Sequence, residues 1–377
     1  MSLENYMVKK YIIIIFSLNL LSGTDIEKAL SIAGNNKIEI QQAITNVPSE
    51  YYAGMEWLIT HMPDNDLKTL SSQFLINNCR LAYEALESSP WGSKVPEEIF
   101  FDAILPYASL NENREEWRED FRKNFFPIVN DVKTSYKAAI LLNHQIFDKV
   151  GVKYSTDRPK ADQSPYESIN AGMASCTGLS ILLIDACRSV GIPARFVGTP
   201  LWYNDSGNHS WVEIWDNGWH FTGAAEPTGE KLDVAWFEEL AGNAKKGDMK
   251  YGIFAVTWNS SEIYFPMNWL PGIKTYGAVD VTNRYAITDE DVAELIPIRI
   301  RSLDLSGLRK SEKITVIEGD NSIFEGITKN ETCDANDNLT FMIPKGKTIT
   351  VKSMDDVQVV DVIKEEIIDL RTGQFDN

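Results

Sequence analysis

The sequence predicts an α+β protein in which a helical region, a mixed core and a small β region follow one another. Three observations predict this order. Apolar residues recur at helical spacing in the first third, short strands follow after about residue 190, and almost only strand-like segments follow residue 276. With 377 residues the chain is long enough for two or three domains. We expect a helical region at 24–130, a mixed core at 131–275 and a small β-sandwich at 276–377.

The charge balance and the cysteine and histidine content limit which molecules the protein is expected to bind. Lys plus Arg is 36 and Asp plus Glu is 54, so the formal net charge is 36 − 54 = −18. A surface this acidic disfavours binding to nucleic acid or to anionic lipid. The chain has four cysteines and four histidines, with no CxxC pair. We therefore expect no metal, no cofactor and no disulfide framework.

The N-terminus has the layout of a secretory signal at residues 1–23. Lys9 and Lys10 precede the apolar run "YIIIIFSLNLL", and the small residues Ser22 and Gly23 follow it. The run is too short to span a bilayer, which needs about 20 apolar residues, so no stable membrane span is expected. Thr24 stands where a lipoprotein signal needs cysteine. We expect export to the periplasm, cell surface or exterior; the alternative is a buried first strand.

Helices are predicted by amphipathic stretches up to residue 150. "DIEKALSIAG" and "LKTLSSQFLINNCRLAYEALESS" place apolar residues on one face, with Gly34 and Pro90 after them. The segment "YKAAILLNHQIFDKV" at 136–150 is a further amphipathic helix. It leads into the segment that holds Cys176.

Strands dominate the second half. "ARFVGT", "HSWVEIWD" and "GWHFTG" read as strands, and Asn217-Gly218 between the last two is a strong hairpin signal. Later strands include "IPIRIRSLDL", "KITVIEG", "LTFMIP" and "KTITVKS". Asp334, Asn336 and Asp337 lie close together before "LTFMIP". A calcium loop needs more ligands, so we interpret them as a β-turn.

Cys176 stands where the chain enters a predicted helix at 177–190. Free N–H groups and the positive end of the helix dipole favour a thiolate there. The same N–H groups could donate to an oxyanion. Cys187 lies in the apolar stripe of this helix and reads as core. Position alone leaves Cys176 open as a structural or a reactive cysteine.

His209 is the natural base for a Cys176 nucleophile. It begins a predicted strand on which His209, Trp211 and Glu213 share one face. The alternative is a histidine held by backbone hydrogen bonds, which is how we interpret His220. Trp202 and Trp211 are candidates to line a substrate groove, although such residues are more often core aromatics.

The joint pattern resembles the transglutaminase-like superfamily. Cys176-Thr-Gly-Leu on a helix, "RSVGIPARFVGT", and "NHSWVEIWDNGWHF" follow in that family's order and spacing over about residues 131–275. The resemblance implies a papain-like fold, in which a cysteine at a helix N-terminus faces a sheet that supplies histidine and a carboxylate. It implies that Cys176 is the nucleophile and His209 the general base.

The third catalytic position departs from the family pattern. Gly223 occupies the position of the family's aspartate, and the next carboxylate is Glu226, before Pro227. Glu226 could orient His209 if the chain turns after Gly223; Asp216 competes, and a site without a carboxylate is the remaining alternative. Asn170 lies six residues before Cys176, where papain-type enzymes place an oxyanion donor.

These features predict a thiol-dependent hydrolase of peptide or amide bonds that acts through an acyl-enzyme on Cys176. Two alternatives remain open. An acyl transferase, such as a protein-glutamine transferase, would pass the acyl group to an amine instead of water. A catalytically degenerate module of the same fold would bind a partner, and Gly223 is the feature that favours it. The expected partner is a peptide or amide substrate.

Overall fold

The computed structural model describes residues 22–286, 295–319 and 321–372. Residues 1–21 of the proposed signal lie outside the described residues, so the signal and the exported location stay predictions. Within the described ranges, no helix is long and apolar enough to cross a membrane.

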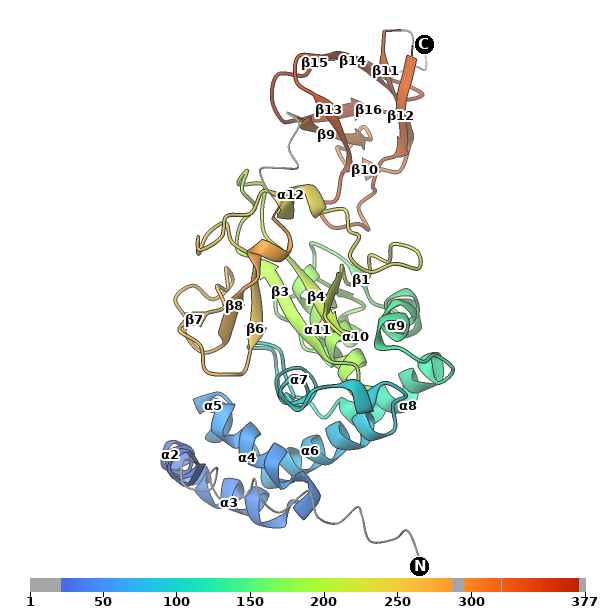
Figure 1. Ribbon diagram of the computed structural model, residues 1–377. Coiled ribbons are helices and arrows are strands. Elements are labelled where there is room, and N and C mark those ends of the chain that lie inside the picture. The colour runs from blue at the N-terminus through green and yellow to red at the C-terminus, as the bar shows by residue number, and fades with distance from the viewer. Residues whose placement is uncertain (1–21, 287–294, 320, 373–377) are drawn as a thin grey trace, which may run out of the picture.

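The α+β class predicted from the sequence is confirmed. Figure 1 shows three layers along the molecule: N-terminal helices, a sheet with helices packed against it, and two β-sheets that hold the C-terminal residues. The described termini lie at opposite ends of this arrangement (Figure 1).

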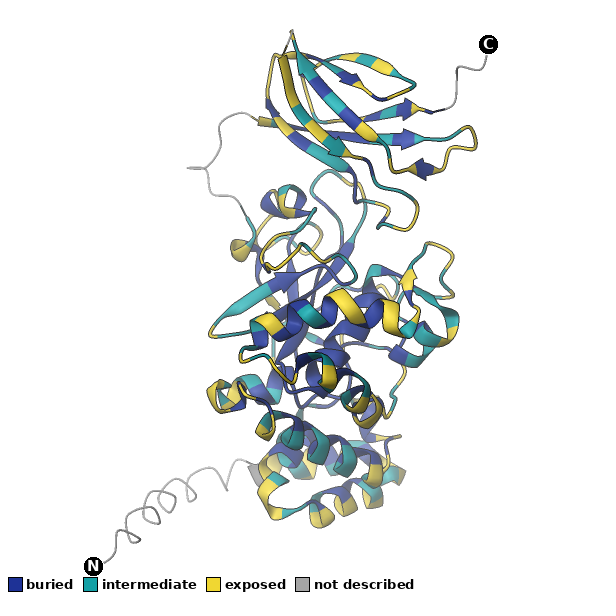
Figure 2. Ribbon diagram, turned by 90° about the vertical axis from the view of Figure 1, so that its right-hand side faces the viewer, coloured by how far each residue is buried: buried dark blue, intermediate teal, exposed yellow. Residues whose placement is uncertain are grey.

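The helical region consists of amphipathic helices whose apolar faces meet. They are α2 (Ser22–Ala33), α3 (Lys37–Asn46), α4 (Tyr52–His61), α5 (Asp64–Leu67), α6 (Ser72–Glu87), α7 (Glu97–Ala103) and α8 (Arg118–Val129). Figure 2 shows buried and exposed residues alternating along them. Their apolar side chains belong to one cluster that runs from Ala29 to Ala278. The expected border at residue 130 therefore crosses a continuous hydrophobic core.

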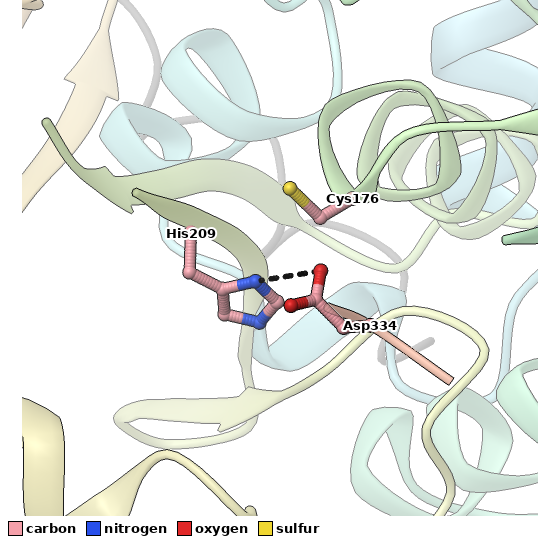
Figure 3. A group of neighbouring side chains, drawn as sticks. All are labelled: Cys176, His209 and Asp334. Carbon is pink, nitrogen blue, oxygen red and sulfur yellow. Dashed lines mark ion pairs between the residues drawn. The ribbon is translucent and has the colours of Figure 1, made fainter. Parts of the chain in front are cut away.

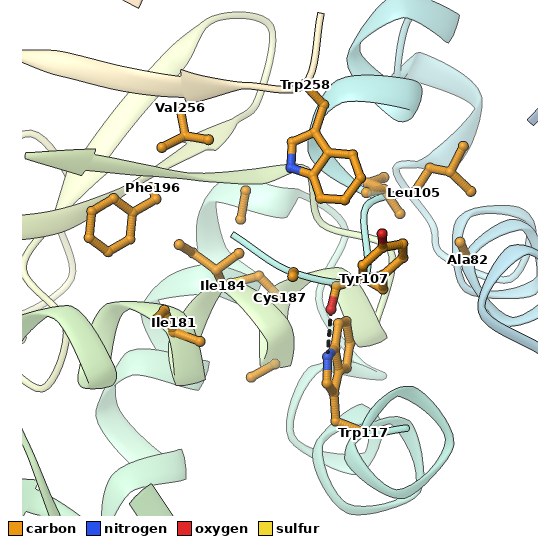
Figure 4. Packing of buried hydrophobic residues seen from close by; sticks show 14 of the residues in the cluster. Ala82, Leu105, Tyr107, Trp117, Ile181, Ile184, Cys187, Phe196, Val256 and Trp258 are labelled. Atoms are coloured by element: carbon orange, nitrogen blue, oxygen red, sulfur yellow. Dashed lines mark hydrogen bonds between the residues drawn. The ribbon is translucent and has the colours of Figure 1, made fainter. Parts of the chain in front are cut away.

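That shared core surrounds α11 (Cys176–Ser189). Ile181, Ile184 and Cys187 of this helix pack between the sheet residue Phe196 and the helical region (Figure 4). Cys187 is fully buried there, which agrees with its interpretation as a core residue. Trp117 Nε1 donates to the Tyr107 carbonyl at 3.0 Å in the same cluster.

Local sequence sets the helices near Cys176. The helix α9 (Ser135–Val150) begins at the cap Thr134 and ends at Gly151, whose φ of 69° suits glycine. The helix α10 (Pro165–Ala171) starts with a capping box formed by Ser164 and Glu167. The short parallel pair β1 (Lys153–Tyr154) and β2 (Met173–Ala174) then leads the chain into α11.

A six-stranded antiparallel sheet covers α11. Its strand order is β5-β4-β3-β6-β8-β7. The strands are β3 (Ala194–Thr199), β4 (His209–Trp215), β5 (Trp219–Thr222), β6 (Phe254–Thr257), β7 (Ile263–Tyr264) and β8 (Gly277–Asp280). The short helix α12 (Glu238–Gly242) lies between β5 and β6 in the chain. The expected Asn217-Gly218 hairpin joins β4 to β5, with Trp215 paired to Trp219.

The core sheet extends past the expected border at residue 275. β8 pairs with β6 and β7, so residues 277–280 belong to this sheet and not to the C-terminal sandwich. The sequence assigned these residues to the sandwich because it placed the whole β region after about residue 276, and the pairing with β6 and β7 is not visible in strand-like composition alone.

The C-terminal region forms two facing sheets around a separate apolar core. One contains β9 (Leu295–Leu303), β10 (Arg309–Lys310), β13 (Leu339–Pro344) and β16 (Glu366–Arg371). The other has the order β12-β11-β14-β15, from β11 (Lys313–Glu318), β12 (Asn321–Ile327), β14 (Thr348–Lys352) and β15 (Val357–Asp361). Their inward residues, among them Ile300, Val316 and Val351, form their own cluster.

Polar contacts join this sandwich to the core. Arg299 of β9 pairs with Glu239 of α12 and, at 3.1 Å, with Glu365. The Tyr203 hydroxyl contacts the carboxylates of both Glu239 and Glu365. At a second place, Asn336 in the loop before β13 donates through Nδ2 to the Asn208 carbonyl at 3.3 Å, beside the start of β4.

Candidate active site

Cys176 is the first residue of α11. The Ser175 side chain caps the helix by accepting a hydrogen bond from the Gly178 N–H at 3.2 Å. The thiol is half-buried, whereas nearly all of the helix behind it is fully buried. A helix N-terminus favours negative charge, so this position suits a thiolate that is also accessible to a substrate.

His209 is the first residue of β4 and is only 1% exposed. Aromatic rings surround its imidazole, with ring centroids 4.9 Å away for Trp236, 5.0 Å for Phe237 and 5.9 Å for Trp211. The stacked Trp211 ring confirms that both side chains project from one face of the strand. This packing fixes the plane of the imidazole.

Three side chains from separate parts of the chain meet at this point. A donor atom each of Cys176, His209 and Asp334 lies within 4.8 Å of the others. Figure 3 shows the Cys176 sulfur and the Asp334 carboxylate near the same ring nitrogen of His209. That nitrogen is Nδ1, which lies 3.6 Å from Asp334 Oδ2. Asp334 comes from the C-terminal sandwich, 125 residues beyond the histidine (334 − 209 = 125).

Glu226 approaches the opposite ring nitrogen. Its Oε2 lies 3.7 Å from His209 Nε2 and accepts a hydrogen bond from Trp236 Nε1 at 2.8 Å. Both carboxylates are therefore close to His209 as ion-pair partners, and neither forms a short hydrogen bond with it. Of the three residues that the sequence nominated as catalytic, His209 therefore lies next to both others: Cys176 is near Nδ1 and Glu226 is near Nε2.

The missing side chain at Gly223 makes room for Glu226. A Cβ atom built on Gly223 would lie 2.0 Å from Glu226 Oε2. The glutamate therefore fills the space into which a residue at position 223 would project. This geometry explains how the chain places a carboxylate beside His209 without an aspartate at position 223.

The charges of the site favour an imidazolium. Burial disfavours the charged form of His209, but Asp334, Cys176 and Glu226 outweigh burial and raise the pKa of His209 well above its ordinary value. Burial likewise opposes ionisation of Asp334, but the nearby His209 lowers the pKa of that carboxyl. A raised pKa of His209 and a lowered pKa of Asp334 are what an ion pair between these two side chains produces, and this pair links the core to the sandwich.

A pocket of about 690 Å³ opens beside these residues. Glu226, Trp236, Asp334, Tyr154 and Leu179 form part of its wall, whereas Cys176 and His209 do not. The pocket thus lies between the core and the loop of the sandwich, and it is large enough for a peptide side chain or a short acyl group.

Other residues nominated from the sequence lie elsewhere. Asn170 is exposed on α10, which does not fit a side chain that donates inside a closed oxyanion site. Trp202 and Trp211 are 1% and 0% exposed and line no part of the pocket beside Glu226. They are core aromatics behind His209, so the predicted substrate contacts are not supported.

Asp216 and His220, which lie in or beside the β4–β5 hairpin, both contact residues outside the candidate active site. Asp216 accepts a hydrogen bond from the Tyr136 N–H at 3.0 Å, at the start of α9. His220 Nδ1 lies 2.6 Å from Asp233 Oδ2. Neither contact involves Cys176 or His209, so Asp216 is not the carboxylate that serves the base.

Sequence reasoning missed Asp334 as a site residue. The expected turn is present, since Asp337 N–H donates to the Asp334 carbonyl at 3.0 Å and Asn336 N–H donates to Asp334 Oδ1 at 2.9 Å. The only hint in the sequence was the group of acidic and amide residues at 334–337. It indicated a turn but gave no information about which surface the turn would contact.

A cysteine at a helix N-terminus, facing a histidine at the start of an antiparallel strand, defines a papain-like thiol site. The comparison with protein families agrees: residues 126–223, about a quarter of the chain, match the model of the Transglutaminase-like superfamily. This match confirms the resemblance predicted from the motifs, and it contains Cys176 and His209 but ends before Glu226. Members of that superfamily are mostly cysteine-dependent enzymes.

Solved structures include two partial likenesses. A candidate cysteine protease from Cytophaga hutchinsonii is 21% identical, with 33% of this chain and 42% of that chain covered and a TM-score of 0.27. Red sea bream transglutaminase is 11% identical, with 77% and 59% covered and a TM-score of 0.26. The chain thus covers less than two thirds of either protein. No curated protein sequence matches it significantly.

Proposed function

We propose that the protein is a thiol-dependent hydrolase of peptide or amide bonds. The observation that carries the proposal is the meeting of Cys176 at the start of α11 with the buried imidazole of His209. Glu226 at Nε2 then acts as the group that orients the ring. Export of the protein, which the N-terminal pattern favours, is part of the same proposal.

The reaction divides into acylation and deacylation. His209 takes the proton of the Cys176 thiol, and the thiolate attacks the substrate carbonyl carbon to form a tetrahedral oxyanion. The N–H groups at the start of α11 can donate to that oxyanion. The C–N bond then breaks, His209 gives its proton to the leaving amine, and a thioester on Cys176 remains.

Water completes the cycle. His209 removes a proton from water, the resulting hydroxide attacks the thioester, and the acid product leaves as the Cys176 sulfur is reprotonated. An amine in place of water would give acyl transfer by the same steps. Glu226 and Asp334 both favour the imidazolium that exists during acylation.

The first test is the rate of Cys176 alkylation against pH. Cys79 and Cys187 are fully buried, and Cys333 is half-buried like Cys176. A Cys333→Ser background therefore leaves Cys176 as the one accessible thiol among the described residues, and mass spectrometry of the modified peptide confirms the site. An ordinary cysteine thiol has a pKa of about 8.5. We expect Cys176 to be alkylated fast at pH values well below that reference.

His209→Ala is the decisive variant. Without the base, alkylation at pH 6 should slow by about 10²-fold or more, because the thiolate loses its imidazolium partner. If Cys176 reacts like an ordinary thiol in both proteins, the hydrolase proposal is wrong, and the alternative of a catalytically degenerate module is the one to test next. If the thiol is activated, thioester turnover with and without added amine separates hydrolysis from acyl transfer.

A further inference from the structure

We infer that Cys176 Sγ, His209 Nδ1 and Asp334 Oδ2 form a binding site for one zinc-type divalent cation, which blocks the nucleophile while it is bound. Thiolate sulfur, imidazole nitrogen and carboxylate oxygen are the three donor types that Zn²⁺ takes from proteins. The inhibition rests on the proposed function, whereas the binding does not.

The separation of the donors fits such an ion. Zinc bonds of about 2.0–2.3 Å at tetrahedral angles place two donor atoms roughly 3.3–3.8 Å apart. His209 Nδ1 and Asp334 Oδ2 are 3.6 Å apart. Cys176 Sγ lies within 4.8 Å of both, so the sulfur must move closer to share an ion with them.

A second observation concerns the imidazole itself. His209 is 1% exposed, yet neither ring nitrogen has a hydrogen-bond partner. Buried polar atoms are nearly always satisfied. A cation at Nδ1 would satisfy that nitrogen in place of its proton, and the nitrogen faces the space between the thiol and the Asp334 carboxylate (Figure 3).

Glu226 matches the environment that metal-binding histidines usually have. Such a histidine commonly presents its other ring N–H to a carboxylate, which fixes the tautomer and raises the basicity of the ligand. Glu226 Oε2 lies on the Nε2 side at 3.7 Å. The three donors leave a fourth tetrahedral position for water or substrate.

Binding and catalysis exclude each other at this site. The cation takes the sulfur lone pair that would attack the substrate and the Nδ1 lone pair that would accept its proton. Loading requires a thiolate and an unprotonated Nδ1, so the cation displaces the proton that Cys176 and His209 share, and binding weakens as the pH falls. The sequence predicted no metal because it has few cysteines and histidines. That argument did not consider a carboxylate ligand from a loop far away in the chain.

The test measures Zn²⁺ binding to the reduced, chelator-treated full chain by calorimetry and by competition with a metal indicator. Co²⁺ serves as a spectroscopic probe, because a cobalt–thiolate bond gives a near-ultraviolet charge-transfer band. We expect one ion per chain, a cobalt–thiolate band that disappears in Cys176→Ser, and protection of Cys176 from alkylation by Zn²⁺.

Asp334→Asn identifies the third ligand. It keeps the shape of the side chain and should weaken Zn²⁺ binding by tenfold or more, whereas Asp337→Asn on the same loop should change it less than threefold. Circular dichroism verifies that each variant is folded. Unchanged affinity in Asp334→Asn or in Cys176→Ser, or the absence of saturable binding, would overturn the inference.

The two proposals fail separately. An activated Cys176 thiol without Zn²⁺ binding rejects only the metal site. Binding of Zn²⁺ to a thiol that alkylates at an ordinary rate when metal-free rejects only the hydrolase.

Discussion

At the scale of single residues, the carboxylate beside His209 Nε2 depends on the absence of a side chain at position 223. Glu226 Oε2 occupies the space 2.0 Å from the position of a Gly223 Cβ. The φ angle of Gly223 is not in the left-handed region that favours glycine. The requirement for glycine here is therefore one of space, and even one methyl group must displace the glutamate.

Gly223→Ala should consequently reduce the activation of Cys176. The orienting carboxylate stabilises the charge and tautomer of the histidine, so displacing Glu226 should lower the pKa of His209. We expect alkylation of Cys176 at pH 6 to slow by about tenfold, as in Glu226→Gln. The measurement is the alkylation rate against pH for both variants.

Gly218→Ala provides the matched control. Gly218 lies in the nearby hairpin turn, and a Cβ there meets no atom within 4 Å. Its alkylation profile should equal that of the unmodified protein. If Gly223→Ala also leaves the profile unchanged, Glu226 has no influence on the histidine.

Sequence alone could nominate the residues that lie in local patterns. Cys176 follows small residues at a helix start, and His209 begins an alternating strand, so short-range periodicity located both. Glu226 was identified as one option because it is the next carboxylate after Gly223. Asp334 was not, because a contact across 125 residues leaves no trace in the spacing of its neighbours.

At the scale of elements, α9 holds the segment that carries Glu226. Asn143 of α9 is 3% exposed. Its Nδ2 donates to the Gly223 carbonyl at 2.8 Å, and its Oδ1 accepts from the Ala225 N–H at 2.9 Å. Ala225 has a φ of 62°, a left-handed conformation that an alanine adopts only when its surroundings impose it.

Asn143→Leu should therefore have two effects. It should lower the free energy of unfolding, and it should leave Glu226 less firmly positioned beside His209. The substitution removes the Asn143 hydrogen bonds to the Gly223 carbonyl and to the Ala225 N–H, and it leaves this half-buried N–H without its partner. We expect a cost of about 1–3 kcal/mol in total. We expect a lower free energy of unfolding in urea and a slower alkylation of Cys176 at pH 6.

Gln145→Ala on the exposed side of α9 is the control. It should change stability by no more than about 0.5 kcal/mol and leave the alkylation rate as it is. Loss of stability in Asn143→Leu with an unaltered alkylation profile would show that Asn143 supports the fold without positioning Glu226.

The positions of the helices and strands were largely predictable from the sequence, whereas the pairing of the strands was not. Amphipathic spacing predicted the helix at 136–150, and Asn217-Gly218 predicted the β4–β5 hairpin, because both signals are local. The strand at 277–280 was expected in the sandwich, yet it pairs with β6 in the core sheet. Strand pairing depends on contacts far apart in sequence, which periodicity does not report.

At the scale of the whole molecule, the C-terminal sandwich is part of the candidate site. Asn336 Nδ2 donates to the Asn208 carbonyl at 3.3 Å, and Asp334 pairs with the adjacent His209. Arg299, through Glu239, and Glu365, through Tyr203, join the same sandwich to the core at a second place. Access to Cys176 thus depends on how the two parts are held together, which composition and motifs could not show.

The His209–Asp334 pair should make this association dependent on pH. The pKa of His209 is raised in the folded protein, so its contribution to stability is full below the ordinary pKa of about 6.5 and is lost as the pH rises through the folded-state pKa. The pKa of Asp334 is lowered, so its contribution is present above about 3.8 and is lost as the pH falls through its folded-state pKa. The pair therefore stabilises the protein most between these limits.

Asp334→Asn should remove this stabilisation in a way that depends on pH. We expect the variant to unfold at a lower urea concentration than the unmodified protein at pH 6. The difference should shrink as the pH rises above 6.5 toward the pKa of His209, because the neutral imidazole no longer attracts Asp334. A His209→Ala, Asp334→Asn double-mutant cycle at each pH isolates the pair from other titrating groups. A coupling that stays constant from pH 6 to alkaline pH would show that the two side chains are held together by packing and not by charge.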